Sequence, residues 1–298
     1  MLNNIQKEIL NIFIVFKHIC SKYDLKYFAI GGTCIGAIRH HGFIPWDDDL
    51  DVAMPIDDYL KFILVCKKEL KKTSYSILNT YKLYHVEFSF CKLQKDSTTF
   101  IEDSVKPYVG RYTGIFIDVF PICGLPKSSF KREQIIRQNM LYHKFDIRMR
   151  LPLRHKKTLK WIIPWILIQP IKIFKRFYYF TDKRWELFKR YKYDESQYIY
   201  FPWRPIPNKD ETYQDIFYRE DFENPIEVPF ENTTICVPNG YDRYLKMDFG
   251  DYMKLPPVDQ QVGNHPAFVD LNTPFKYYAD LMRQGKLNWK ELERKNKK

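Results

Sequence analysis

The stretch that decides the fold runs from residue 30 to residue 51 and reads IGGTCIGAIRHHGFIPWDDDLD. It opens on the glycine turn Gly31-Gly32-Thr33, directly after the apolar segment 25–30, which predicts a strand. Thr33 is a predicted N-cap for a helix that continues to Arg39. A strand, a glycine turn and a helix in this order place backbone N–H groups where they can hold a phosphate.

The aspartates that end this stretch alternate with apolar residues. Residues 49–54 read DLDVAM and predict a strand. Successive side chains of a strand point to opposite faces, so Asp49 and Asp51 share one face. Two carboxylates that close repel each other unless a cation lies between them, and Mg²⁺ prefers oxygen ligands of this kind. The alternation therefore predicts a site for Mg²⁺ or Mn²⁺ on Asp49 and Asp51.

The alternative is a solvated acidic turn, in which the aspartates only cap the next element. Three features favour the metal site, and the glycine turn is the first. The second is Asp118, a single acid inside the apolar strand predicted over residues 114–121, where an unpaired charge is costly to bury. The third is a pair of cations suited to phosphate, Arg39 and Lys92, the latter in a strand predicted over residues 85–93.

Three blocks of the chain closely resemble the LicD family, which includes bacterial phosphocholine transferases and, more distantly, fukutin and fukutin-related protein. The first block is the stretch 30–51, and the second is residues 114–121, GIFIDVFP. The third lies within residues 241–257 and contains YDRYL, FGDYM and LPP. The family pattern continues after its Pro-Pro pair with an Arg followed by a His. Here residues 258–265 contain His265 but no Arg.

The resemblance implies a nucleotidyltransferase-like α/β (α+β) fold with a mixed sheet. It implies transfer of phosphocholine, or a related phospho-alcohol, from CDP-choline or a similar nucleotide donor. The acceptor is a hydroxyl of a cell-surface glycan such as lipopolysaccharide, teichoic acid or capsule, which can be lipid-linked. Asp49 and Asp51 match the family's metal-binding pair and Asp118 matches its third acid. Gly32 and Thr33 match the donor-phosphate turn.

These matches give a mechanism as a hypothesis. The turn Gly31-Gly32-Thr33 holds the phosphate that leaves with the nucleotide, and Arg39 or Lys92 neutralises charge on the transferring group. Asp118 ligates a second metal or accepts the proton of the acceptor hydroxyl. Two other functions stay open: a nucleotidyltransferase that moves a nucleoside monophosphate to a small molecule or protein, and a non-catalytic basic module that binds membrane or nucleic acid.

The positive charge of the chain is concentrated in one segment. The 298 residues carry a formal charge of +12, but residues 126–192 alone hold 19 Lys and Arg against 4 Asp and Glu. We predict a mainly helical basic insertion over 126–192, between a core of 1–125 and a C-terminal part, 193–298, that completes it. The region 154–180 is predicted to meet an anionic membrane surface. A solvated basic face is the alternative, whereas the apolar run 161–171 argues against nucleic acid as the partner.

Other features place the chain in a compartment. The six cysteines are irregularly spaced, which indicates free thiols in a reducing environment rather than a zinc site or disulfides. No secretory signal and no run of 18 uncharged apolar residues is visible. We therefore expect a cytoplasmic protein that is peripheral on the inner face of the membrane through its basic segment.

Overall fold

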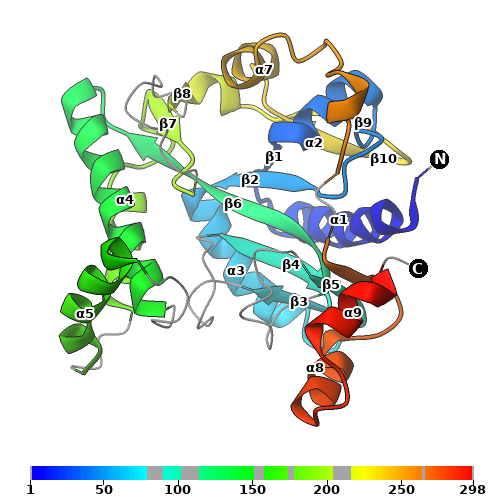
Figure 1. The fold of residues 1–298 in the computed structure, drawn as a ribbon. Helices are drawn as coiled ribbons and strands as arrows, with labels where there is room; N and C mark the ends of the chain where they lie inside the picture. Colours follow the sequence, from blue (N-terminus) through cyan, green and yellow to red (C-terminus); the bar gives the residue numbers. More distant parts are fainter. Residues whose placement is uncertain are drawn as a thin grey trace.

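The computed structural model describes residues 2–78, 90–101, 114–150, 158–173, 178–203, 216–263 and 266–296 (Figure 1). It is a mixed α/β protein. The helices are α1 (Asn4–Tyr23), α2 (Gly31–Ile35), α3 (Ile56–Glu69), α4 (Ser129–Arg150), α5 (Leu159–Ile173), α6 (Tyr179–Phe188), α7 (Tyr241–Phe249), α8 (Phe275–Arg283) and α9 (Trp289–Asn296). The strands are β1 (Phe28–Ala29), β2 (Asp51–Pro55), β3 (Tyr75–Leu78), β4 (Cys91–Lys95), β5 (Thr99–Ile101), β6 (Ile115–Leu125), β7 (Tyr198–Tyr200), β8 (Ile216–Tyr218), β9 (Ile226–Phe230), β10 (Thr233–Val237) and β11 (Phe268–Asp270).

A mixed sheet in the order β1-β2-β6-β4-β3 forms the centre of the molecule. β2 and β6 are parallel, and the other neighbours are antiparallel. β6 is a long strand that crosses the molecule (Figure 1). Its first part pairs with β2 and β4, and its last three residues pair with β7, which in turn pairs with β8. β6 therefore connects the centre of the sheet to the group of helices α4, α5 and α6.

Helices α1 and α3 pack against β6 and against each other. The buried side chains of α1 recur at helical spacing, which is why this segment forms an amphipathic helix; they are Gln6, Ile9, Leu10, Ile12, Phe13, Phe16, Ile19 and Cys20. A capping box between Asn3 and Gln6 starts the helix. The buried amide of Gln6 also donates to the Asp47 carbonyl oxygen at 2.9 Å. The first turn of α1 thereby fixes the backbone at Asp47, the first of three adjacent aspartates.

Most predicted elements are confirmed, with shifted ends. The strand predicted over 25–30 is only Phe28–Ala29, the strand predicted over 49–54 begins at Asp51, and β6 continues past the predicted end at residue 121. The description of Thr33 as an N-cap was wrong: α2 begins at Gly31, because two glycines can turn directly from strand into helix. Residues 85–89 of the strand predicted over 85–93, and His265, lie outside the described residues.

The described part of the basic segment is helical, as predicted, and consists mainly of α4, α5 and α6. Ile135, Ile136, Leu187 and Phe188 join the main hydrophobic core, so α4 and α6 are anchored on it. A separate small cluster of Met149, Ile168 and Phe180 holds the three helices together. All six cysteines are free thiols, as expected. Within the described ranges, no helix combines the length and the apolar character needed to cross a membrane.

The C-terminal block is tied to the core by a buried carboxylate. Asp221 is 4% exposed and accepts two hydrogen bonds from the Nε of Arg243, at 2.7 and 3.0 Å. Its carbonyl oxygen also accepts the N–H of Gly240, just before α7. A Cβ on Gly240 would lie 2.0 Å from the Asp221 carboxylate, so only glycine fits there. This pair therefore fixes the position of α7.

We predict that Arg243→Met lowers the free energy of unfolding by about 3 kcal/mol, because it leaves the Asp221 carboxylate buried without its cation. The matched control is Glu220→Gln, which removes an exposed contact of the same Arg243 and changes stability by less than about 1 kcal/mol. Urea unfolding followed by circular dichroism measures both. Equal stability of Arg243→Met and wild type would show that the pair does not anchor α7.

Candidate active site

Three charged side chains form a row across the middle of the sheet. The parallel register pairs Asp51, the first residue of β2, with Asp118 of β6. The antiparallel register on the other side of β6 pairs Asp118 with Lys92 of β4. Paired residues of neighbouring strands lie about 5 Å apart and point to the same face. The predicted metal ligand, third acid and cation are therefore brought together, from segments far apart in the sequence.

Lys92 is a buried partner of Asp118. Only 4% of its side chain is exposed, and its Nζ lies 2.9 Å from Oδ1 and 3.3 Å from Oδ2 of Asp118. The ammonium also lies over the ring of Phe116, 3.4 Å from the centroid. A lysine in a central strand requires such partners, because an unpaired buried charge is unstable. Lys92 is therefore a buried partner of Asp118 and not a surface charge.

Asp47 and Asp49 lie just before β2 and add negative charge beside Asp51. We call Asp47, Asp49, Asp51 and Asp118 the acidic cluster. Burial and the neighbouring Asp49 raise the pKa of Asp47 to about 8, and the two carboxyl groups are hydrogen-bonded. Burial, followed by the charges of Asp49 and Asp118, raises the pKa of Asp51 well above its ordinary value, and Lys92 only partly opposes this. Asp47 was not among the predicted site residues. The only sign of it in the sequence was the run of three adjacent aspartates.

The glycine turn lies against these carboxylates. Gly31 has φ +55°, and a Cβ at this position would lie 4.0 Å from Asp51 Oδ2. A Cβ on Gly32 would lie 2.9 Å from Asp47 Oδ2, so a side chain at Gly32 would crowd the acidic cluster. The hydroxyl of Thr33 accepts the backbone N–H of Asp51 at 2.8 Å. The turn and the start of β2 are thus joined directly.

Tyr244, in the C-terminal block of residues 241–257, contacts the first residue of the glycine turn. The Gly31 N–H donates to the hydroxyl of this buried tyrosine at 2.9 Å. The first N–H group of the predicted phosphate cradle is therefore already bonded within the chain. Among the described residues, no acceptor bonds the N–H groups of Gly32 and Thr33, and these two remain available to a phosphate. The sequence places Tyr244 in the third family block, but no local pattern could predict its contact with Gly31, because the two residues are far apart in the chain.

Arg39 has a different set of partners from the one predicted. Its Nη1 donates to the carbonyl oxygens of Tyr252 and Lys254, at 2.6 and 3.3 Å, and its Nε donates to His40 Nε2 at 3.0 Å. Burial lowers its pKa from the ordinary value. The guanidinium therefore attaches the C-terminal block to the segment after α2. This structural role does not depend on a substrate phosphate.

The acidic cluster can hold a divalent cation only together with other ligands. Across the described residues, no group of three or more His, Cys, Asp or Glu side chains is arranged so that it could hold a metal ion. Mg²⁺ is usually bound by one or two carboxylates, with waters and substrate phosphates as the other ligands. Asp49 and Asp51 fit that mode, because a cation between them would relieve the repulsion that raises the pKa of Asp51.

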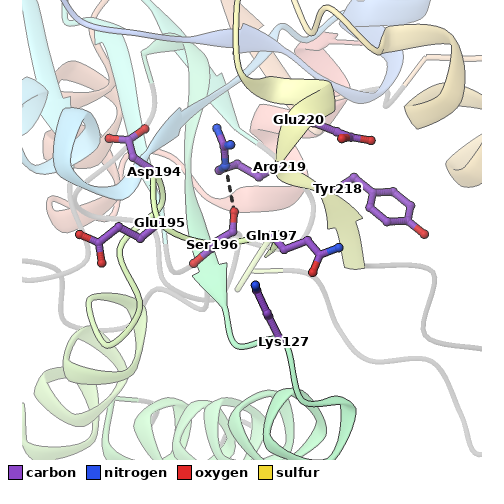
Figure 2. A pocket seen from close by; sticks show the side chains of 8 residues that line it. All are labelled: Lys127, Asp194, Glu195, Ser196, Gln197, Tyr218, Arg219 and Glu220. Atoms are coloured by element: carbon purple, nitrogen blue, oxygen red, sulfur yellow. Dashed lines mark hydrogen bonds between the residues drawn. The ribbon is translucent and has the colours of Figure 1, made fainter.

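A hollow of about 440 Å³ lies at the other end of β6 (Figure 2). Its wall includes Lys127, Tyr218 and Arg219, and the Arg219 Nε donates to the Ser196 carbonyl oxygen at 2.9 Å. Along an extended strand, Lys127 is roughly 30 Å from Asp118. This hollow is therefore separate from the acidic cluster, and no sequence pattern indicated it.

We predict that stability falls as pH rises from about 4 to about 8, because the folded state favours the protonated form of Asp47 and this preference is lost through its raised pKa. Asp47→Asn flattens this dependence and is more stable than wild type at pH 8 by roughly 1–3 kcal/mol. Thermal melts between pH 5 and 8 measure the slope. The exposed Asp251→Asn is the control with the same change of side chain. An unchanged slope in Asp47→Asn would contradict the prediction.

Comparison with known proteins identifies the family of the chain. Residues 24–158 match the family described as LicD/FKTN/FKRP, nucleotidyltransferase domain. The chain is 31% identical over 271 residues to the lipopolysaccharide cholinephosphotransferase LicD of Haemophilus influenzae, which covers 86% of this chain and 92% of that protein. Two shorter matches are to uncharacterised proteins. The one from Rickettsia typhi is 33% identical over 82 residues, which is 26% of each chain. The one from Rickettsia prowazekii is 38% identical over 55 residues, which is 17% of this chain and 21% of the relative. The family match covers the glycine turn and the acidic cluster, and the long match extends over most of the chain. The chain belongs to the LicD family.

Proposed function

We propose that this LicD-type transferase moves phosphocholine, or a closely related phospho-alcohol, from CDP-choline or a similar nucleotide donor to a hydroxyl of a cell-surface glycan. The observation that carries the proposal is the row of Asp51, Asp118 and Lys92 beside the glycine turn. The Haemophilus relative is a lipopolysaccharide cholinephosphotransferase, which supports the choice of phosphocholine and of lipopolysaccharide as acceptor.

Donor binding would use the turn and the acid pair. Asp49 and Asp51 would hold Mg²⁺ or Mn²⁺, which supplies charge neutralisation to the donor diphosphate. The N–H groups of Gly32 and Thr33, which no acceptor among the described residues bonds, would donate to the phosphate that stays with the nucleotide. Lys92 limits the negative charge of the cluster through its ion pair with Asp118, so that a polyanionic donor can approach.

The transfer step forms one bond and breaks one bond. The acceptor hydroxyl oxygen attacks the phosphorus that carries the alcohol, the bond from that phosphorus to the bridging oxygen breaks, and CMP leaves. The hydroxyl proton passes to a base or to solvent. Lys92 already contacts both oxygens of Asp118. We predicted that Asp118 either ligates a metal or accepts the proton of the acceptor hydroxyl. Its contacts with Lys92 favour a ligand or positioning role over proton acceptance.

The acceptor places the reaction near a lipid surface. Lipopolysaccharide carries a lipid anchor, and a lipid-linked glycan presents its hydroxyl groups close to the membrane. A site at an anionic membrane surface, reached through the region 154–180, is therefore part of the proposal. The described residues of this region are 158–173 and 178–180, which contain α5 and the start of α6.

We predict that Asp51→Asn lowers turnover at least 10³-fold without lowering stability, because the change removes a ligand and also removes a buried charge. The matched control is Asp57→Asn, an exposed aspartate in the first turn of α3, which leaves turnover unchanged and stability within about 1 kcal/mol. Release of CMP from CDP-choline measures turnover. EDTA stops the reaction and Mg²⁺ or Mn²⁺ restores it. Full activity of Asp51→Asn, or activity in EDTA, would overturn the assignment of the acid pair.

The mass of the product separates the proposed reaction from the alternatives. Incubation with CDP-choline and a glycan acceptor should add phosphocholine to the glycan and release CMP, because the bond that breaks lies next to the transferred phosphorus. Mass spectrometry of the acceptor is the measurement. Addition of a cytidylyl group would instead show a nucleotidyltransferase. No product with any nucleotide donor, and no thermal shift with nucleotide and Mg²⁺, would favour a non-catalytic binding module.

A further inference from the structure

One face of α5 is apolar and exposed. Leu159, Ile163, Ile166 and Leu167 are 72%, 54%, 55% and 73% exposed. At 100° per residue these four positions fall within about 100° of one another on the helix, so they form one continuous stripe. We call this set the α5 stripe. Single exposed apolar residues are ordinary on protein surfaces, whereas a continuous stripe of them indicates an interaction site.

The opposite face of α5 already has its packing partners. Ile168 is 3% exposed and packs with Met149 of α4 and Phe180 of α6. It lies on the far side of the helix from the centre of the α5 stripe, at helical spacing. Figure 1 shows α5 at the outer end of α4, away from the central sheet. The helix is therefore held by one face and presents the other outward.

The sequence around α5 is strongly basic. Residues 147–181 contain nine Lys and Arg and no Asp or Glu. Arg154, Lys156 and Lys157 precede the helix, and Lys175 and Arg176 follow it. An apolar stripe with cations before and after it is typical of a segment that enters the headgroup zone of an anionic bilayer. A solvated basic face, the alternative for this segment, does not explain why the exposed side chains are aliphatic.

The composition and length of α5 also distinguish a membrane surface from the other possible partners. The stripe is aliphatic, and aliphatic side chains offer no ring on which a nucleic-acid base can stack. The 15 residues of α5 are about 22 Å long, shorter than the roughly 30 Å of a bilayer core. A helix of this length and composition lies along a membrane surface instead of crossing it.

We propose that the α5 stripe inserts into the headgroup region of an anionic bilayer, to which the net positive charge of the surrounding sequence attracts it, and so places the active site at the membrane. The proposal depends on the proposed function in one respect only: a lipid-linked glycan acceptor is the reason why the enzyme would act at a membrane. Lipid binding itself involves neither donor nor acceptor, so it can be tested whether or not the enzyme transfers phosphocholine.

The test uses the full chain and sedimentation with vesicles of phosphatidylcholine, with and without 30% phosphatidylglycerol. Wild type should bind the anionic vesicles at least tenfold better than the neutral ones, and 0.5 M NaCl should release most of the protein. The double variant Ile166→Ser with Leu167→Ser should bind anionic vesicles at least tenfold more weakly. The matched control, Leu64→Ser with Ile226→Ser, removes two exposed apolar residues from α3 and β9 and should bind within twofold of wild type.

Further measurements distinguish lipid binding from misfolding, self-association and nucleic-acid binding. Circular dichroism and melting temperature must show that the α5 variant is folded. Its turnover on a soluble glycan fragment should stay within twofold of wild type, because α5 lies outside the catalytic cluster. Equal vesicle binding by the α5 variant and wild type would overturn the proposal. A lipid-free dimer lost in the α5 variant, or binding of single-stranded RNA that competes with vesicles, would overturn it in favour of a second copy or a nucleic acid.

Discussion

The parallel pairing of β2 with β6 is the constraint on which the active site depends. It sets Asp51 beside Asp118 in the middle of the sheet, and a third strand supplies Lys92 to Asp118 at 2.9 Å. With Asp47 and Asp49 added at the start of β2, negative charge exceeds positive charge, and burial raises the pKa of both Asp47 and Asp51. The repulsion that remains is the physical reason for expecting a divalent cation and a phosphate donor at this place.

The C-terminal block is as much a part of this site as the acids are. Tyr244 accepts the N–H of Gly31, and Arg39 reaches back to the carbonyl oxygens of Tyr252 and Lys254. The Asp221–Arg243 pair fixes the helix that carries Tyr244. Contacts of this kind hold a phosphate-binding turn in one geometry before the ligand arrives, which reduces the ordering that binding requires.

Sequence reasoning could find the elements of the site but not all of their partners. The alternation around Asp49 and Asp51 and the glycine turn are local patterns, and in the structure the turn lies against Asp51 and Asp47. The pairing of Lys92 with Asp118, and the use of Arg39 as a structural tie, depend on strand register and long-range packing. No local pattern encodes them. The exposure of the α5 stripe was also hidden, because α5 is apolar nearly all round and periodicity cannot then show which face is buried.

Crystals grown with CDP-choline and Mn²⁺, measured at a wavelength where manganese scatters anomalously, test the proposed metal and donor site most directly. We predict an anomalous peak between the carboxylates of Asp49 and Asp51, with the donor diphosphate against the backbone of Gly32 and Thr33. A nucleotide bound elsewhere, such as the hollow beside Lys127, with no peak at the two aspartates, would contradict it.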